Sequence, residues 1–472
     1  MSFVSVQFAV LCLACLAVYP WLPRRGQNAL ILLTSYVFYG SWDWRFLSLL
    51  AGTTAFDFFV VQRIEAARLR GDAQLAKRWL QASLTSNLGV LGFFKYFGFF
   101  SHELGALLQR LGLEVSGPTL HVVLPVGISF YTFQSISYAV DVYRGEGRAC
   151  RDFLDFATFI AFFPQLVAGP IERAKHMLVQ FESPRHVTSA HVQDGLWLIL
   201  IGFFRKVVVA DTAAHFSRKL FAAPDHYTSV ELALGVLLFT LQIYGDFAGY
   251  SDIARGVAKL FGFDLMRNFA HPYFSQNVSE LWRRWHISLS SWLRDYLYVP
   301  LGGNRKGELR TYLNLFVTML LGGLWHGASW NFVIWGGLHG TYLCVHRVLR
   351  PALDALAARG AVWAGALRAS GMLATFLLVA FAWLFFRSTD LALTQRYLSG
   401  LFAGVFEPTR LLRITAVLYL LMLAIDLPQY LTDDETRIAR LPRLVRLPVA
   451  ACMWLLLFAS RDSGEPFIYF QF

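Results

Sequence analysis

Two of the 12 histidines, His286 and His326, lie where an ionisable side chain is expected to be costly: His326 in an apolar run, and His286 on the apolar face of a predicted helix. His326 follows Trp325 in the run LLGGLWHGASW, where the glycines would let a ligand or another backbone come close. Composition alone suits a hydrogen-bonded structural histidine equally well, but an imidazole in hydrocarbon must be paired or line a cavity, and such positions are usually functional. A neutral imidazole can take a proton from a hydroxyl or thiol that attacks an acyl carbon. We therefore take His326 and His286 as candidate catalytic residues, with His326 as the general base.

Metal chemistry is the main rival reading of these histidines. A zinc or haem site favours histidines at close helical spacing with carboxylate or thiolate partners, and the sequence arranges none in this way. His339 and His346 are two turns apart on one helical face, and we interpret them as packing and interface residues. We expect no metal, no permanently bound cofactor and no disulfide; the scattered cysteines are Cys12, Cys15, Cys150, Cys344 and Cys452.

The stretch around His286 predicts an amphipathic helix over residues 281–296. His286 falls on its apolar face, while Arg284, Ser288 and Asp295 fall on the opposite stripe. Such a helix would lie in the membrane interface or line a wet funnel, with Asn277 or Ser279 as its cap. A glycine-rich turn with three basic residues follows in VPLGGNRKGELR. The candidate substrate-binding residues are Trp282, Arg284, Trp285, Asp295, Asn304, Trp325 and Asn331.

The composition indicates an integral membrane protein. Hydrophobic residues make up 56% of the 472, only 15% are charged and the mean hydropathy is +0.47, whereas about a quarter of a soluble domain is charged. Apolar runs long enough to cross a bilayer recur along the chain, and their continuity argues against a β-barrel. We expect one domain over 1–472, with a motif-bearing core at about 120–350. It should hold roughly 11–13 transmembrane and re-entrant helices.

We attribute most of the net charge of +11 to basic loops that face anionic lipid headgroups. The alternative is that a few cationic residues near a cytoplasmic cavity meet an anionic cofactor. Nucleic-acid binding would need a soluble basic domain, and no stretch is long and polar enough to form one. The first apolar run is followed by Arg24 and Arg25, the reverse of a cleavable signal peptide, so we expect it to stay as a helix. The expected partners therefore include membrane lipid and no nucleic acid.

Three segments predict irregular or polar features at membrane depth. PVGISFYTFQSISYAVDVYRG carries polar residues that pack against other helices or line a cavity. FPQLVAGPIER predicts a broken or re-entrant helix, because proline and glycine free backbone groups that must be satisfied inside protein. YGDFAGYSDIARG holds Asp246 and Asp252, each either a functional carboxylate or the partner of a basic residue such as Arg255. Gly323 with Gly327, and Gly336 with Gly340, predict close helix packing.

The chain resembles the membrane-bound O-acyltransferases, in the bacterial branch related to alginate O-acetylation. The resemblance rests on RRWHISLSSWLRDYLYVPLGGNR and GGLWHGASWNFVIWGGLHG, with support from PVGISFYTFQ, FPQLVAGPIER and GDFAGYSDIARG. It implies a ring of helices around a central tunnel, with His326 at the catalytic position and His286 at the second polar position. It also implies that acetyl-CoA is the acyl donor on the cytoplasmic face of the bacterial inner membrane. The acetyl group would pass to a periplasmic acetyltransferase partner protein and then to an exported polysaccharide.

A transporter or flippase for an acylated or glycan precursor is the alternative from a different functional class. Broken helices and polar residues near the midplane also mark transporters. Transporters often contain internal repeats, and this sequence shows none.

Overall fold

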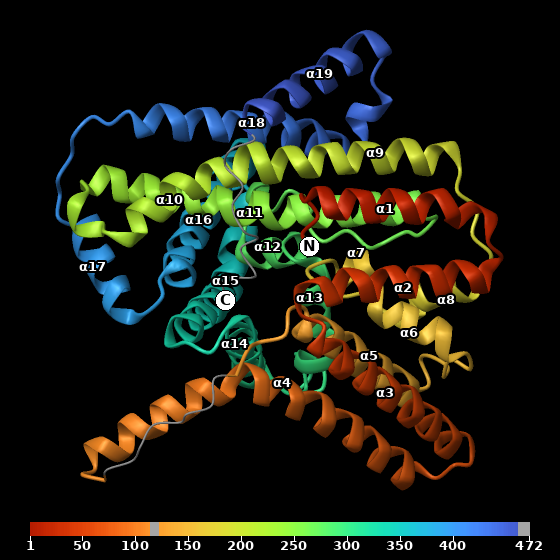
Figure 1. Cartoon of the computed structure of the whole chain (residues 1–472). Helices are drawn as coiled ribbons and strands as arrows, with labels where there is room; N and C mark the ends of the chain where they lie inside the picture. Colours follow the sequence, from red (N-terminus) through yellow and green to blue (C-terminus); the bar gives the residue numbers. More distant parts are fainter. Residues whose placement is uncertain (114–121, 461–472) are drawn as a thin grey trace. The chain divides into compact units, whose positions relative to one another are not determined.

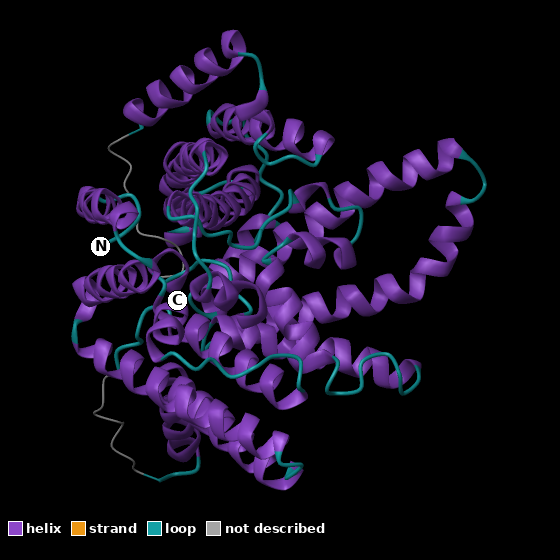
Figure 2. Cartoon of the chain, turned by 90° about the vertical axis from the view of Figure 1, so that its right-hand side faces the viewer, coloured by secondary structure: helices purple, strands orange, loops and turns teal. Residues whose placement is uncertain are grey.

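A computed structural model of the chain describes residues 1–113 and 122–460, and every regular element within these ranges is a helix (Figure 2). Of the described helices, four are long and apolar enough to cross a bilayer: α3 (Arg45–Leu69), α11 (Ser229–Leu260), α16 (Ala361–Arg387) and α18 (Leu411–Thr432). The predicted all-α polytopic membrane fold is confirmed. The ring around a central tunnel stays a prediction.

The chain divides into two compact units. The first comprises Met1–Val192 and Val257–Met266, and the second comprises Gln193–Gly256 and Arg267–Phe472. Both candidate histidines belong to the second unit. The single domain over 1–472 with its core at about 120–350 stays a prediction.

The first unit is built from helices that pack in neighbouring pairs. In Figure 1, α3, α4 and α5 lie against one another, while α6 packs on α2 and on α8. The polar side chains of α5 are buried, and Gln134 Nε2 donates to the carbonyl of Phe159 at 3.0 Å. The bounds are α1 (Val6–Val18), α2 (Arg24–Asp43), α4 (Ala73–Arg110), α5 (Ile128–Arg144), α6 (Phe153–Ala161), α7 (Phe163–Leu166) and α8 (Ala174–Glu182).

The break predicted in FPQLVAGPIER is confirmed. It lies in the first unit, where α7 is a single turn, and proline at its start prevents continuation of α6. The freed backbone N–H of Phe163 donates to Ser35 Oγ at 3.1 Å. Gln165 Nε2 reaches the carbonyl of Phe159 at 2.7 Å. The broken segment is fully buried, and other side chains supply the hydrogen bonds that a continuous helix would have made.

The second unit contains the long helices that carry the candidate site. Its π-helical segments are η2 (Phe204–Asp211) and η5 (Arg294–Tyr298). The helices are α9 (Ser189–Phe203), which begins in the first unit, α10 (Thr212–Ala222), α12 (Val278–Arg284), α13 (Ile287–Leu293), α14 (Glu308–His326), α15 (Trp330–Ala357), α17 (Leu391–Leu401) and α19 (Arg443–Ala459).

Helices α14 and α15 form a closely packed hairpin, visible as neighbouring teal helices in Figure 1. The sequence predicted close helix packing at Gly323 and at Gly336 without saying what each would meet. In the structure the two face each other: a Cβ added to Gly323 would meet the Cα of Gly336 at 3.0 Å. Gly340 approaches Phe316 in the same interface. Gly327 differs from the prediction, because it follows the end of α14 and meets the ring of Phe332.

The hairpin provides a matched pair of glycines for a stability test. A Cβ on Gly336 would lie 2.5 Å from the Met319 carbonyl oxygen, whereas on Gly337 it would meet no atom closer than 3.9 Å. Gly336→Ala should therefore destabilise the protein by about 1–3 kcal/mol through overpacking, and Gly337→Ala should leave stability nearly unchanged. Thermal unfolding of both variants in detergent checks this. Equal midpoints for the two would contradict the close helix approach.

The aspartates of YGDFAGYSDIARG are paired with basic residues, as one of the two readings of the sequence expected. Asp246 lies 2.8 Å from Lys206 Nζ. Asp252 pairs with Arg205 and lies 3.8 Å from Arg255. These contacts join α11 to η2 inside the second unit.

Candidate functional site

His286 lies at a break between two helices, so the predicted continuous helix over 281–296 is wrong. Helix α12 ends at Arg284, α13 begins at Ile287, and His286 has the left-handed φ of 43°. The cause is a contact that the sequence does not reveal: Ile287 N–H donates to the Asn268 carbonyl at 2.9 Å, which replaces a helical hydrogen bond. Ser288, expected on the polar stripe, is fully buried. The predicted cap is confirmed, since Asn277 Oδ1 accepts from Glu280 N–H at 2.8 Å.

The ring of His286 is fully buried among polar and aromatic groups of the second unit. Its Nδ1 lies 3.2 Å from Asn268 Oδ1. The ring of Phe247, on α11, stands perpendicular to the imidazole at 4.6 Å between centroids. Trp325, near the end of α14, is 6.0 Å away on the same measure.

His326 is the last residue of α14 and is 7% exposed. The helix ends there because Gly327 adopts extended backbone, and Ser329 then caps α15 by accepting from Asn331 N–H. The His326 imidazole stands edge to face with Trp335 and Phe386, each at 5.0 Å between centroids. These rings enclose the imidazole in an apolar wall, which is the setting that excludes water from a proton-transfer step.

Trp325 links the two candidate catalytic histidines. Its ring centroid lies 4.8 Å from that of His326 and 6.0 Å from that of His286. The structure therefore brings both histidines to one aromatic cluster from separate segments of the chain. Their catalytic roles stay predictions.

Three further sequence candidates lie in or beside this cluster. Trp282 contacts Trp335 at 5.8 Å between centroids, and Trp285 contacts Trp383 at 5.0 Å. Asn331 makes a hydrogen bond between two helices: its Nδ2 donates to the Ser388 carbonyl at 2.8 Å and so joins α15 to the end of α16. Substrate binding by all three stays a prediction.

The remaining candidates lie on polar segments. Arg284 Nε donates to Glu280 at 2.8 Å and its Nη1 to the Ala270 carbonyl at 3.1 Å, so its guanidinium is held within the protein. Asp295 pairs with Arg294 at 2.7 Å, and this hydrogen bond raises the pKa of Arg294. Asn304 is exposed in the turn before α14. A role of these residues in binding substrate also stays a prediction.

Two residues that were not among the sequence-based site candidates adjoin the cluster. Asn268 contacts His286, but its position in a loop between helices gave no periodic signal. His339, expected to be a packing residue, is 1% exposed and lies 4.6 Å from Trp335 and 5.0 Å from Trp282 between ring centroids. Within the described residues neither of its ring nitrogens has a hydrogen-bond partner. A buried polar atom left without a partner costs roughly 1–3 kcal/mol, which ordinary packing does not explain.

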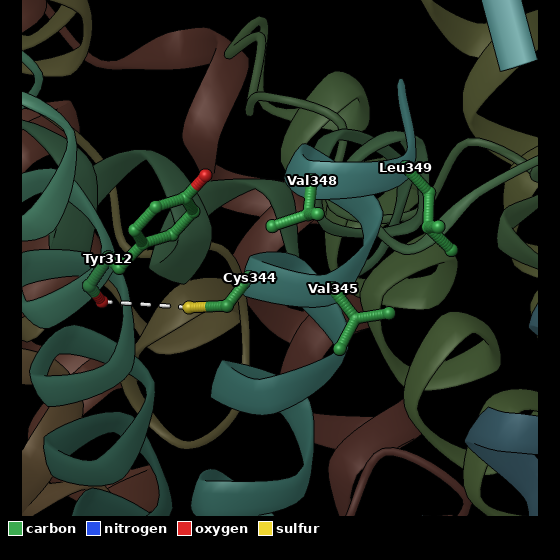
Figure 3. A pocket seen from close by; sticks show the side chains of 5 residues that line it. All are labelled: Tyr312, Cys344, Val345, Val348 and Leu349. Atoms are coloured by element: carbon green, nitrogen blue, oxygen red, sulfur yellow. Dashed lines mark hydrogen bonds between the residues drawn. The ribbon is translucent and has the colours of Figure 1, made fainter. Parts of the chain in front are cut away.

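An apolar pocket in the same hairpin is separate from the histidine cluster. It has a volume of about 280 Å³ and lies between Tyr312 of α14 and Cys344, Val345, Val348 and Leu349 of α15 (Figure 3). Cys344 Sγ donates to the Tyr312 carbonyl at 3.6 Å, drawn as the dashed line. Tyr312 precedes His326 by 14 residues, or about 21 Å along the helix at 1.5 Å per residue. This pocket therefore belongs to the outer end of the hairpin.

The residues present do not form a recognisable metal site. Over residues 1–113 and 122–460 there is no group of three or more histidine, cysteine, aspartate or glutamate side chains placed to hold an ion. The chemistry that the cluster offers is proton transfer by imidazole in a desolvated aromatic setting.

Comparisons with known proteins agree on one family. Residues 148–384 match the profile of MBOAT, the membrane-bound O-acyltransferase family. The chain is 40% identical to the "probable alginate O-acetylase" of Azotobacter vinelandii, over 97% of each chain. It is 44% identical to the protein of that name from Pseudomonas aeruginosa, over 83% of this chain and 72% of the other. It is also 36% identical to a "peptidoglycan O-acetyltransferase" of Helicobacter pylori, over 79% of this chain and 73% of that one.

Proposed function

Because this chain belongs to the membrane-bound O-acyltransferase family, we propose that it moves acetyl groups from cytoplasmic acetyl-CoA across a bacterial inner membrane for O-acetylation of an exported polysaccharide. That the chain is a membrane-embedded acyltransferase follows from the family itself. The acetyl donor, the direction of transfer and the acceptor belong to the proposal. The observation that carries it is the buried aromatic cluster in which Trp325 contacts both His326 and His286.

In the proposed reaction His326 acts as general base. Its imidazole takes the proton from a hydroxyl of an intermediate acceptor, from which the acetyl group later reaches the glycan, while that hydroxyl oxygen bonds to the thioester carbonyl carbon. The carbon–sulfur bond then breaks, the acetyl ester forms, and the proton on His326 passes to the departing CoA thiolate. A transient acetyl group on His326 is the variant of this scheme in which the histidine carries the acyl group first. His286 orients the donor or the acceptor beside it.

The acceptor is proposed from the relatives. Two of them are named for alginate and one for peptidoglycan, so O-acetylation of a glycan is the property that their names share. A glycan on the far side of the membrane cannot meet cytoplasmic acetyl-CoA directly. A periplasmic acetyltransferase partner that completes the transfer is therefore part of the proposal.

Loss of the protein should remove acetyl esters from one envelope polymer without removing the polymer. The expected result is that a deletion strain still exports the glycan but with its O-acetyl content reduced to background, restored by the wild-type chain. Ester-linked acetate released by mild alkali, normalised to total sugar of each purified polymer, checks this. Normal acetylation per sugar with much less polymer at the surface would instead indicate a transporter or flippase.

A further inference from the structure

The side-chain oxygen of Asn268 lies at the centre of a small buried polar group next to His286. It accepts from the backbone N–H of Ser288 at 3.3 Å and from Ser288 Oγ at 3.0 Å. It also lies 3.2 Å from His286 Nδ1. All three residues are at most 1% exposed, so solvent does not compete for these contacts.

The orientation of the Asn268 amide follows from its partners. A backbone N–H can only donate, so the amide atom that faces the N–H of Ser288 must be the oxygen. On the opposite side, Asn268 Nδ2 donates to Ser251 Oγ of α11 at 3.4 Å. The usual ambiguity between amide oxygen and nitrogen is therefore removed by the network.

The same network decides which nitrogen of His286 carries the hydrogen. Nδ1 faces Asn268 Oδ1, which is an acceptor. Ser288 Oγ lies 3.4 Å from Nδ1 and already donates its hydrogen to Asn268 Oδ1. It therefore presents a lone pair to the ring as well. In the neutral imidazole Nδ1 must then be the donor, and the basic lone pair lies on Nε2.

We propose that Asn268 is a positioning residue that holds His286 as the Nδ1–H tautomer, with Nε2 as the nitrogen that meets the reacting groups. This inference rests on the proposed function in one respect, namely that His286 takes part in acetyl transfer. Asn268 would then act on the reaction through His286 and without touching the substrate. Its role resembles that of any group that fixes a catalytic imidazole in the productive tautomer.

Asn268 is itself held firmly enough for this role. Its carbonyl accepts from Ile287 N–H at 2.9 Å, so its main chain and its side chain both bind the segment that carries His286. The neighbouring Arg267 pairs with Glu435, and the ring of Phe269 lies 5.1 Å from that of Trp285. His286 has a positive φ, which costs roughly 1–3 kcal/mol for a residue other than glycine. The bonds to Asn268 offset this strain.

Two substitutions of Asn268 distinguish the effect of its side-chain oxygen, the hydrogen-bond acceptor for His286 Nδ1, from the effect of its size. Asn268→Asp keeps an oxygen facing Nδ1, whereas Asn268→Leu keeps the size and removes the acceptor. Nitrogen-15 NMR of histidine-labelled protein in nanodiscs reports which ring nitrogen is protonated, and the His286 signals are assigned by their loss in His286→Gln. Ser288→Ala is the control, because it removes a neighbouring hydroxyl and leaves Asn268 Oδ1 in place.

Neutral His286 should be protonated on Nδ1 in the wild type, in Asn268→Asp and in Ser288→Ala. Asn268→Asp should also shift the Nδ1–H resonance, because the carboxylate makes a stronger, charge-assisted hydrogen bond. Asn268→Leu should lose this preference, with kcat for acetyl transfer lower by about 10- to 100-fold and KM little changed. The wrong tautomer would turn an N–H instead of a lone pair toward the group that His286 orients, and it would leave the binding surface in place.

The inference is overturned if wild-type His286 carries its hydrogen on Nε2, or if Asn268→Asp leaves the Nδ1–H resonance unmoved. The Asn268→Asp result tests the proposed hydrogen bond even if Asn268→Leu does not fold. Full activity of His286→Gln, with the expected tautomer in the spectra, would instead count against His286 in the proposed function and leave the role of Asn268 intact.

Discussion

Replacing His326 with alanine is expected to lower the rate of acetyl transfer about 10²–10⁴-fold, the usual cost of removing a general base. The imidazole lies at the end of α14 between Trp325, Trp335 and Phe386, so no solvent molecule can readily take its place in the reaction. The measurement is the initial rate of acetyl transfer in membranes, divided by the amount of folded enzyme. His326→Gln should lose activity to a similar degree while filling more of the space.

The control for this substitution is His215→Ala. His215 is an exposed histidine of α10 that contacts Lys219, so its loss should change neither the rate nor the amount of protein. If His326→Ala is made in normal amounts and acetylates at the wild-type rate, the assignment of His326 must be dropped.

Replacing Arg205 with methionine is expected to destabilise the second unit by about 3–5 kcal/mol, the cost of leaving buried charges without their partner. Arg205, in η2, is 5% exposed and pairs with Asp252 of α11 and with Asp426 of α18, the latter at 2.5 Å. The cavity beside these groups holds only about 10 Å³, room for roughly one water molecule, so solvent cannot neutralise both carboxylates. Thermal unfolding in detergent and the amount of folded protein per cell measure the effect.

An exposed ion pair provides the comparison for Arg205. Arg350 lies 3.5 Å from Asp354 on α15, and both side chains are about 70% exposed. Arg350→Met should therefore cost at most about 1 kcal/mol. Equal losses in the two variants would show that burial of the Arg205 pairs contributes nothing to stability.

Much of the second unit could be predicted because its signals are local. The apolar run around His326, the Gly336 and Gly340 spacing and the Asn277 cap each depend on residues within a few turns, and all three appear in the structure where they were expected. The break at FPQLVAGPIER could be predicted for the same reason, since proline acts on its own helix.

The geometry around His286 could not be predicted, because a residue distant in sequence determines it. Helical periodicity placed His286 inside a continuous helix. The Asn268 carbonyl instead accepts a hydrogen bond from the backbone N–H of Ile287, and helix α12 ends after about two turns. The pairing of Arg205 with Asp426 spans more than two hundred residues and has no periodic signature either. Contacts between polar residues that are far apart in the sequence therefore determine the helix break at His286 and the Arg205 ion pair, which local patterns could not predict.

The most direct test of the central claim follows a labelled acetyl group from acetyl-CoA to a glycan. Inverted membrane vesicles that contain the chain and its periplasmic partner would receive acetyl-CoA labelled in the acetyl group, with the glycan inside. The proposed function predicts thioester cleavage and ester-linked label on the glycan with the wild type, and neither above background with His326→Ala. No thioester cleavage by the wild type, or equal cleavage by His326→Ala, would contradict acetyl transfer by His326.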